Sequence, residues 1–358
     1  MNINKQNLNI KRFDWSWLVL NYNCNQKCKW CYTRSNRNNN FLSLKTLSGC
    51  LDLLASLGMK DCILIGGEPT LYPYLIKLIA YGSKIGLRLY LVTNGIRLHD
   101  ESFLNSLKNN GIYNISLSIP SFDKKEHEKI VNKSGVFEKK IKALERLSKS
   151  NIRYNINCVI DNKKITHYQN FLERAQQLKI KTITFLSCFP VIMNGDCVKT
   201  NIPNPQTTAN IIEKIYQLEP KYQNIRIVYN FNLPLCLLNK NILEKLMEDK
   251  RIYTLSLLSY GTGFSIDPQG NVLPGNHWVG CPLTTIWHNK KRQQIVSKKQ
   301  FLQRWNSKKI QNFRKTLWYY PSKKCMNCAY WSKYCLGGNP LLRLAFDMEK
   351  TIEQKSKW

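Results

Sequence analysis

The stretch Ser16–Tyr32, SWLVLNYNCNQKCKWCY, joins a short apolar run to three closely spaced cysteines, Cys24, Cys28 and Cys31. The apolar run predicts a β-strand, so the cysteines lie in the loop that follows the first strand. Thiolates are the ligands that iron–sulfur clusters require, and three of them leave one iron of a four-iron cubane open. An open iron can bind a substrate or a cofactor, much as an open position marks a catalytic zinc site. The stretch therefore predicts a reactive [4Fe–4S] cluster; a zinc site or three buried thiols is the alternative.

Short apolar runs alternate with helical patterns from about Trp15 to Tyr229. The predicted strands are SWLVLNYN (16–23), CILIGGE (62–68), RLYLVTN (88–94), YNISLSIP (113–120), YNINCVI (154–160), TITFLSCF (182–189) and IRIVYNF (225–231). The helical patterns begin near Ser43, Tyr74, Glu101, Lys124, Thr166 and Pro205. Because the strands are β-branched and nearly continuous in apolar character, we expect both of their faces to be buried in a parallel sheet. Repeated βα units predict an α/β barrel or partial barrel with its active site at the C-terminal strand ends.

The composition changes after about Phe231, where the chain becomes rich in Trp, Tyr, Gly and Pro. This part also holds a second group of cysteines, Cys325, Cys328 and Cys335. We therefore expect a smaller, loop-rich domain that depends on metal ligation for part of its stability. The predicted organisation is an N-terminal extension (1–14), a barrel (15–230) and the small domain (231–358).

The composition constrains the setting in which the chain works. No signal peptide is visible and no stretch reaches the roughly 18 apolar residues of a membrane span, so we expect a cytoplasmic protein with no membrane part. Thirteen cysteines in a reducing compartment indicate metal ligation or catalysis rather than disulfides. The formal net charge of +31 indicates a polyanionic partner, either nucleic acid or an acidic peptide or protein. A generally solvated, Lys-rich surface is the alternative.

The C-x3-C-x2-C spacing followed by Tyr32 resembles the signature of the radical S-adenosylmethionine (SAM) superfamily. The resemblance implies a partial (β/α)6 barrel of the TIM type. It also implies that the open iron chelates SAM, whose cleavage yields a 5′-deoxyadenosyl radical that abstracts hydrogen from the substrate. Further motifs agree: Gly66-Gly67-Glu68-Pro69 resembles the family's GGEP element, and the strand ends near Asn94 and Ser118 resemble its SAM-lining positions. We expect the glycines to let the backbone approach SAM closely.

The implied SAM-binding residues are Tyr32, Gly66, Gly67, Glu68, Pro69, Thr93, Asn94, Ser118 and Asn157. Glu68 supplies a negative charge that favours an ammonium group. For Ser118 and Asn157, ordinary strand polarity is the alternative.

The second cysteine group, followed by Leu-Gly-Gly, resembles the C-terminal part of a SPASM or twitch-like domain, which carries auxiliary [4Fe–4S] clusters. The stretch FSIDPQGNVLP (264–274) resembles the hairpin that precedes the auxiliary site in that family. Three other ligand positions of the family correspond here to Ser259, Gly275 and Asn339, so we expect one auxiliary cluster to be absent and one to remain.

The remaining auxiliary cluster needs a fourth ligand if the site is closed. Cys281 is the preferred candidate because it lies within the small domain; Cys236 and His277 are the other candidates. A zinc site built from the same residues is the alternative, since C-x2-C also suits zinc.

The other cysteines have simpler explanations. Cys50, Cys62 and Cys197 are expected to be packing residues or incidental surface thiols. Cys158 and Cys188 fall on or just after barrel strands, so either could face the cavity and donate a hydrogen atom, as in peptide epimerases of the superfamily. The competing expectation is that both pack in the core.

The resemblance to the SPASM group implies a peptide or protein substrate, possibly acidic, and a reductant such as flavodoxin or ferredoxin. The leading hypothesis is an intramolecular carbon–carbon or thioether crosslink in a ribosomally made peptide. Few residues precede Cys24, so we expect leader recognition by a separate protein or by the basic surface itself. The alternatives are peptide epimerisation, formylglycine formation in a sulfatase, RNA modification and a non-catalytic iron–sulfur protein.

Overall fold

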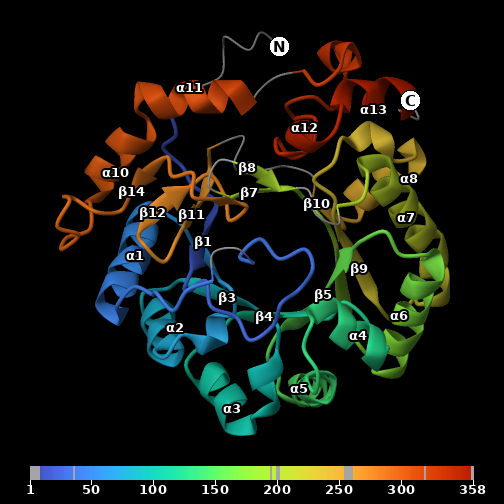
Figure 1. Cartoon of the computed structure of the whole chain (residues 1–358), viewed down its shortest axis with the longest axis horizontal. Coiled ribbons are helices and arrows are strands. Elements are labelled where there is room, and N and C mark those ends of the chain that lie inside the picture. Colours follow the sequence, from blue (N-terminus) through green and yellow to red (C-terminus); the bar gives the residue numbers. More distant parts are fainter. Residues whose placement is uncertain are drawn as a thin grey trace.

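The computed structural model describes residues 9–34, 37–193, 196–198, 202–253, 261–317 and 320–355. Eight parallel strands run side by side in one curved sheet, in the order β1-β2-β3-β4-β5-β6-β9-β10. Their bounds are Trp15–Val19, Asp61–Ile65, Arg88–Thr93, Asn114–Ser118, Tyr154–Ile160, Thr182–Ser187, Arg226–Asn230 and Ile252–Tyr253. The strands curve around the centre of the molecule and do not close on themselves (Figure 1). The α/β partial barrel predicted from the sequence is confirmed.

Helices α1–α8 cover the outside of the curved sheet (Figure 1). Their bounds are Leu44–Ser56, Leu75–Lys84, Glu101–Asn109, Lys124–Val131, Phe137–Lys149, Ile165–Gln177, Pro205–Leu218 and Lys240–Glu248. Several begin at a side chain that accepts a hydrogen bond from the first turn, as Ser43 does from the Thr46 amide and Asp123 from the Glu126 amide. The predicted strands and helix starts are confirmed, but the sequence pattern missed α5 as a separate helix. Asn132 ends α4 in the left-handed conformation, with φ 48°, which asparagine tolerates better than most residues.

The C-terminal part adds strands to the other edge of the same sheet. β11 (Gly263–Ile266) pairs in parallel with β1, and β12 (Asn271–Leu273) and β14 (Thr284–Thr285) follow in antiparallel order. A second, three-stranded sheet joins β7 (Val191–Met193), β8 (Asp196–Val198) and β13 (Trp278–Val279). The other described helices after β11 are α10 (Lys298–Trp305), α11 (Lys308–Leu317), α12 (Leu342–Ala345) and α13 (Met348–Lys355).

All three predicted parts of the chain contribute residues to one hydrophobic core. Phe13 packs against Phe264, Phe301 and Trp305, with ring centroids 5.7, 6.1 and 6.3 Å away. The boundary predicted at residue 230 falls directly after β9, yet strands on both sides of it belong to one sheet. The domain division stays a prediction, and the first eight residues of the proposed extension lie outside the described residues.

The expectation that both faces of each strand are buried is wrong. In β4, Ile115 and Leu117 are fully buried against the helices, whereas Ser116 and Ser118 are only partly covered and line an internal cavity. β2, β3, β5 and β6 show the same alternation. The reason is that the inner side chains surround a large open space instead of filling it, as those of a closed TIM barrel do.

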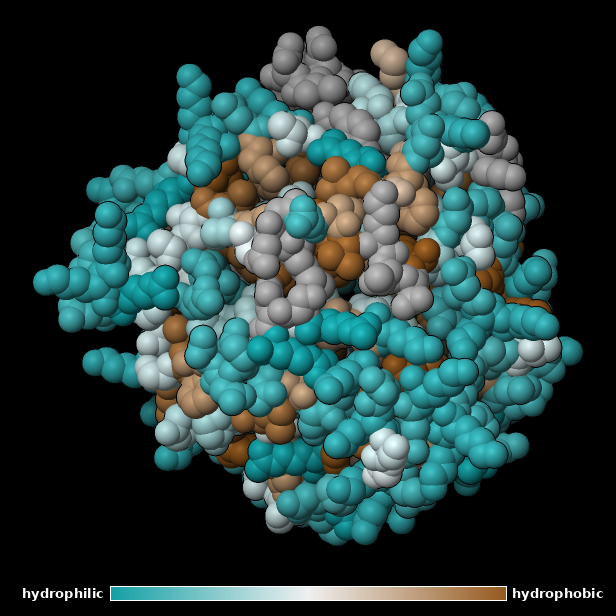
Figure 2. Space-filling model, viewed as in Figure 1, coloured by the Kyte–Doolittle hydropathy of each residue, from teal (hydrophilic) through white to brown (hydrophobic). Residues whose placement is uncertain are grey.

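Hydrophilic residues cover most of the molecular face shown in Figure 2, and hydrophobic residues gather near its centre. None of the helices in the described part of the chain is long and apolar enough to cross a membrane.

Candidate active site

The loop after β1 brings Cys24, Cys28 and Cys31 to one wall of the internal cavity, whose volume is about 1650 Å³. The Gln26 amide donates to Cys24 Sγ at 3.4 Å, and Cys28 Sγ donates to Gln26 Oε1 at 3.7 Å. The Lys27 amide donates to the Val131 carbonyl at 2.9 Å, which fixes the loop to the end of α4. The predicted cysteine trio thus lies at the C-terminal ends of the strands, as expected for this fold.

The electrostatic environment of the trio suits thiolates only when a cation is present. Burial raises the pKa of the Cys24 thiol to about 11 and that of the Cys28 thiol to about 12, and Cys31 adds to both shifts. A positively charged group among the three sulfurs reverses this effect, as iron does in a cluster. Gln26 is only 2% exposed, and its Nε2 donates to none of the described residues. Three thiols beside an uncommitted N–H donor fit an iron–sulfur cluster, whose sulfurs accept such hydrogen bonds.

Among the described residues, no three His, Cys, Asp or Glu side chains are arranged to hold a single metal ion. A four-iron cubane is larger than one ion, and the thiolates that hold it stand correspondingly further apart.

Gly66 and Gly67 allow the end of β2 to pack against the backbone of the cysteine loop. The Gly67 amide donates to the Asn21 carbonyl at 2.8 Å, and the Glu68 amide donates to the Asn23 carbonyl at 2.7 Å. A Cβ added at Gly66 lies 2.6 Å from the Asn21 oxygen, and one added at Gly67 lies 2.2 Å from the Asn23 oxygen. The sequence-based reason for the glycines was close approach to SAM; the contact seen here is with the loop that carries the cysteines.

Glu68 joins the ends of β2 and β3. Its side chain is 1% exposed, and Oε1 accepts hydrogen bonds from the Thr70 amide (3.1 Å), the Thr70 hydroxyl (2.7 Å) and the Thr93 hydroxyl (2.6 Å). Oε2 accepts one bond, from the Asn94 amide at 2.8 Å. A carboxylate accepts about four hydrogen bonds, so the described residues already occupy the acceptor positions of Glu68. Pro69, another predicted residue, makes no hydrogen bond to this carboxylate among the described residues. It begins the short helix η2 (Pro69–Leu71), for which Glu68 is the N-cap.

Asn94 links the end of β3 to the cysteine loop. Its Nδ2 donates to Asn25 Oδ1 at 2.7 Å and lies 3.9 Å from Cys24 Sγ. Glu68 holds the amide of the same residue. The predicted residues Glu68, Thr93 and Asn94 therefore form one hydrogen-bonded unit beside Cys24.

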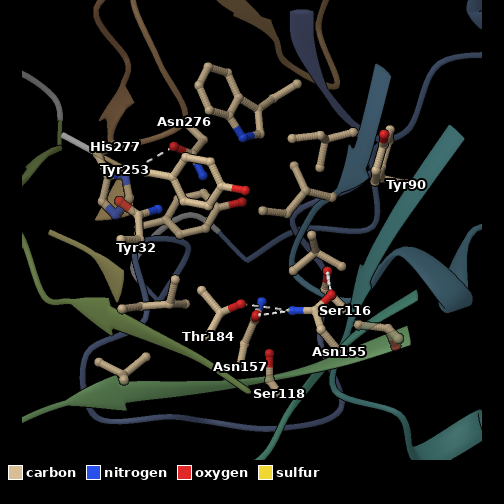
Figure 3. A pocket seen from close by; sticks show the side chains of 18 of the residues that line it. Tyr32, Tyr90, Ser116, Ser118, Asn155, Asn157, Thr184, Tyr253, Asn276 and His277 are labelled. Atoms are coloured by element: carbon tan, nitrogen blue, oxygen red, sulfur yellow. Dashed lines mark hydrogen bonds between the residues drawn. The ribbon is translucent and has the colours of Figure 1, made fainter. Parts of the chain in front are cut away.

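Tyr32 spans the cavity wall from the cysteine loop to the C-terminal part. Its hydroxyl donates to the Gly66 carbonyl at 3.2 Å, and its ring centroid lies 5.3 Å from that of His277 (Figure 3). His277 Nδ1 lies 2.9 Å from Asn276 Oδ1, and burial lowers the pKa of this imidazole to about 4. His277 is therefore neutral at physiological pH, and it lines this cavity.

Ser118 and Asn157 are direct neighbours in the register between β4 and β5, and both line the cavity (Figure 3). Asn157 Oδ1 accepts a hydrogen bond from Asn155 Nδ2 at 2.8 Å, and Ser116 Oγ donates to Asn155 Oδ1 at 2.8 Å. Thr184 on β6 accepts from Asn155 Nδ2 at 3.2 Å. The inner wall at this point is therefore polar and neutral.

Lys140 is a cavity residue that the sequence analysis missed. It lies on α5, is 1% exposed, lines the cavity and donates through Nζ to the Ser118 carbonyl at 3.1 Å. Burial lowers the pKa of this ammonium to about 8, while nearby Cys28 and Glu68 act in the opposite direction. A signal existed in the sequence: Lys140 occupies the buried helical stripe of α5 with Ala143, Leu144 and Leu147, where a charged residue is out of place.

The remaining barrel cysteines differ in whether they face the cavity or the hydrophobic core. Cys188 follows β6 and lines the cavity, whereas Cys158 is 0% exposed and packs in the hydrophobic core. Cys50 and Cys62 are fully buried, which confirms their predicted packing role.

The second cysteine group forms a tight loop around η6 (Lys323–Asn327). The pKa of the Cys325 thiol is raised to about 12, mainly by burial and in part by the nearby Cys335 and Cys328. The Ser332 amide donates to the Cys335 carbonyl at 2.9 Å, and the Gly337 amide donates to Cys335 Sγ at 3.3 Å. The loop therefore brings the three predicted thiols together.

Cys335 lies beside the segment that contains Cys236. Burial raises the pKa of the Cys335 thiol, and a hydrogen bond from the Leu235 backbone lowers it. Leu235 belongs to η5 (Leu235–Leu237), so Cys236 is adjacent in the chain to a direct contact of Cys335. Of the three positions where the family's auxiliary ligands are replaced, Gly275 and Asn339 line the central cavity, and Ser259 lies outside the described residues.

Comparisons with known proteins agree with this geometry. Residues 18–175 match the family model of the radical SAM superfamily. The chain is 30% identical over 128 residues to an AdoMet-dependent heme synthase of Methanosarcina barkeri (strain Fusaro / DSM 804), covering 36% of each chain. It is 28% identical over 161 residues to the PqqA peptide cyclase of Granulibacter bethesdensis (strain ATCC BAA-1260 / CGDNIH1), covering 44% of this chain and 43% of the relative. The chain thus matches less than half the length of these curated relatives.

Two solved structures share the fold over almost the whole chain. SuiB of Streptococcus suis bound to the precursor peptide SuiA has a TM-score of 0.73 at 16% identity, covering 94% of this chain and 74% of SuiB. The enzyme anSMEcpe with bound AdoMet and the Kp18Cys peptide has a TM-score of 0.69 at 17% identity. The match covers 95% of this chain and 97% of anSMEcpe.

Residues 18–175 are therefore a radical SAM domain, which confirms the resemblance seen in the cysteine motif. Proteins of the radical SAM superfamily use SAM and a [4Fe–4S] cluster, and solved neighbours of this chain contain bound AdoMet.

Proposed function

We propose that this chain is a radical SAM enzyme that forms an intramolecular crosslink in a ribosomally made peptide or protein. The observation that carries the proposal is the shared cavity of about 1650 Å³ behind Cys24, Cys28 and Cys31. Pockets for one small ligand have volumes of about 300–1000 Å³, so this cavity has room for SAM and for a peptide segment. The two neighbours whose structures contain peptides add support.

In this proposal, Cys24, Cys28 and Cys31 hold the reactive cluster. SAM lies among Tyr32, Gly66, Gly67, Glu68, Pro69, Thr93, Asn94, Ser118 and Asn157. When bound, the cluster and SAM supply a hydrogen-abstracting radical. The cavity walls keep water from the reacting atoms. The Glu68 carboxylate favours an ammonium group nearby through its charge.

We also propose that Lys140 faces the carboxylate of SAM. Its ammonium is buried beside Cys28, and within the described part of the chain it makes no ion pair. A buried ammonium without a carboxylate partner is costly, and an anionic group at this position offsets that cost. With its pKa of about 8, Lys140 keeps its charge at neutral pH.

Cys325, Cys328 and Cys335 are proposed to hold one auxiliary [4Fe–4S] cluster. The contact between Cys335 and the Leu235 backbone favours Cys236 over Cys281 as the fourth ligand. A cytoplasmic reductant such as flavodoxin or ferredoxin is expected to supply electrons, and a separate leader-binding protein is compatible with the proposal.

The test is anaerobic incubation of the reconstituted enzyme with SAM, a reductant and short peptides encoded beside its gene, followed by mass spectrometry. Crosslinking removes two hydrogen atoms from the peptide and joins two residues that then resist separation on fragmentation. The Cys24→Ala variant is the control. A peptide that stays unmodified while SAM is consumed contradicts crosslinking as the reaction.

Epimerisation is a second candidate, because Cys188 presents a thiol to the cavity. A thiol can return a hydrogen atom to a substrate radical, so the product has the same mass as the substrate. In deuterated water an epimerase adds one deuterium per modified residue, and Cys188→Ala abolishes this incorporation. A crosslink without deuterium uptake excludes the second candidate.

A further inference from the structure

The internal cavity extends from the cysteine loop to the opposite end of the barrel. The residues that line it include Cys24 and Cys31 at the C-terminal strand ends and Lys60 and Arg88 at the N-terminal ends. Because the strands are parallel, their N-terminal ends meet at one edge, so the cavity has a second end far from the cysteines. The proposed radical chemistry gives this second end no role.

Cations gather at this second end, which we call the basic mouth and define as Arg12, Lys60, Arg88, Arg153 and Arg226. They precede or begin β1, β2, β3, β5 and β9, and all five are exposed and line the cavity. Asp14 and Asp61 line the same region, but Asp61 is already held by Arg88 at 2.5 Å. The mouth therefore carries a clear excess of positive charge.

Two further cations of the mouth, Arg153 and Arg226, have neutral partners. Arg153 donates to the Tyr113 hydroxyl at 2.5 Å, and Arg226 donates to the carbonyls of Asp249 and Lys250 at 3.3 and 3.1 Å. Within the described residues, neither makes an ion pair. Their charge is therefore available to an anionic ligand.

Aromatic rings lie between these cations. Trp15 and Trp17 line the cavity with ring centroids 4.5 Å apart, and Tyr90 lies 5.1 Å from Tyr113. The Arg153 guanidinium lies 4.9 Å from the Tyr113 centroid, which holds that side chain in place at the rim. Aromatic residues and arginines are enriched at surfaces that bind other proteins.

We infer that the basic mouth binds an acidic segment of the peptide substrate, an inference that rests on the proposed peptide-modifying function. Farther in, the wall is lined by amide and hydroxyl groups, Ser116, Asn155, Asn157 and Thr184, which hydrogen-bond a peptide backbone (Figure 3). A nucleic acid strand carries its charge along its whole length and needs cations along the whole path. Here the cations stand at the rim and this wall is neutral, so a peptide with carboxylates at one end fits better.

The length of the barrel fixes the spacing within the substrate. β2 has five residues and β5 has seven. An extended peptide rises about 3.3 Å per residue, as the strands do. A substrate held by its carboxylates at the mouth therefore places a residue about five to seven positions away next to the cysteine loop.

The test measures fluorescence anisotropy of a labelled peptide that carries three consecutive glutamates, added to the reconstituted full chain. The variant Arg12→Glu, Lys60→Glu, Arg153→Glu reverses three mouth cations. The matched control Lys139→Glu, Lys142→Glu, Lys299→Glu reverses three exposed lysines that do not line the cavity. Both change the net charge equally, so a non-specific charge effect is the same in both. A milder variant with Gln at the same three mouth positions covers the case in which reversal impairs folding.

We expect the mouth variant to bind the peptide at least about tenfold more weakly than wild type and the control to stay within about twofold. Equal weakening in both variants, or no binding to wild type, overturns the inference. So does tighter, mouth-dependent binding of a single-stranded RNA oligonucleotide of matched charge. SAM cleavage by the wild type is measured separately, and its failure contradicts the proposed function while leaving the binding result to stand.

Discussion

Lys140 Nζ lies 3.1 Å from the main-chain oxygen of Ser118, so a buried ammonium meets the end of β4 beside the cysteine loop. α5 supplies this charge from the outer layer of the barrel. The helix thus contributes directly to the cavity that the strand ends form.

Lys140→Met is expected to weaken SAM binding, because hydrogen bonds to charged groups contribute about 1.5–3 kcal/mol. Removing a buried charge is not expected to lower the thermal stability. The measurements are equilibrium SAM binding to the reconstituted protein and the melting temperature. Lys140→Arg keeps the charge and should retain part of the affinity. Unchanged SAM affinity in Lys140→Met contradicts the assignment.

Gly67→Ala is expected to displace the cysteine loop, because the new Cβ lies 2.2 Å from the Asn23 oxygen. Overpacking of this kind costs about 1–3 kcal/mol. We predict lower iron content after reconstitution and a lower melting temperature. Gly275→Ala is the matched control, since its nearest neighbour is a Trp278 atom 3.9 Å away. Equal iron content in the two variants counts against the close packing of the loop.

Cys236→Ser is expected to disturb the auxiliary cluster more than Cys281→Ser. The reason is the contact between Cys335 and the Leu235 backbone. Iron content and the electron paramagnetic resonance signal of the reduced protein report the effect. A larger loss of iron in Cys281→Ser than in Cys236→Ser contradicts this prediction and favours Cys281, the fourth ligand preferred from the sequence.

Acid is expected to destabilise the protein through His127. Its side chain is 0% exposed and its Nδ1 bonds the Ser121 carbonyl; burial lowers its pKa from 6.5 to about 4. Between these values the unfolded chain binds the proton and the folded chain does not, so stability falls as the pH drops from about 6.5 towards 4. His127→Phe should flatten this part of the profile in urea unfolding at stepped pH. An unchanged slope shows that other groups cause the acid sensitivity.

The periodicity of the sequence was sufficient to predict the barrel strands, and the cysteine spacing was sufficient to predict the radical SAM domain. Both signals lie within short stretches of sequence, so they can be recognised without knowledge of the fold. The inward faces of the strands were harder to predict. Ser116 and Asn155 alternate with apolar residues, but the sequence does not show that their side of the sheet faces open space.

Contacts between segments that are distant in the chain could not be predicted from the sequence either. The proximity of Leu235 to Cys335 depends on how η5 packs against the C-terminal loop. The packing of Gly67 against Asn23 depends on the pairing of β1 with β2. Lys140 was recognisable as a charge on a buried stripe only once α5 was separated from α4.

The most direct test of the central claim is reductive SAM cleavage by anaerobically reconstituted protein, measured together with its iron content. Wild type is compared with a Cys24→Ala, Cys28→Ala, Cys31→Ala variant and with a Cys325→Ala, Cys328→Ala, Cys335→Ala variant. We predict about eight irons in wild type and about four in each variant, with 5′-deoxyadenosine formation lost in the first. Fully loaded wild-type protein that forms no 5′-deoxyadenosine contradicts the assignment of Cys24, Cys28 and Cys31 as the radical-generating site.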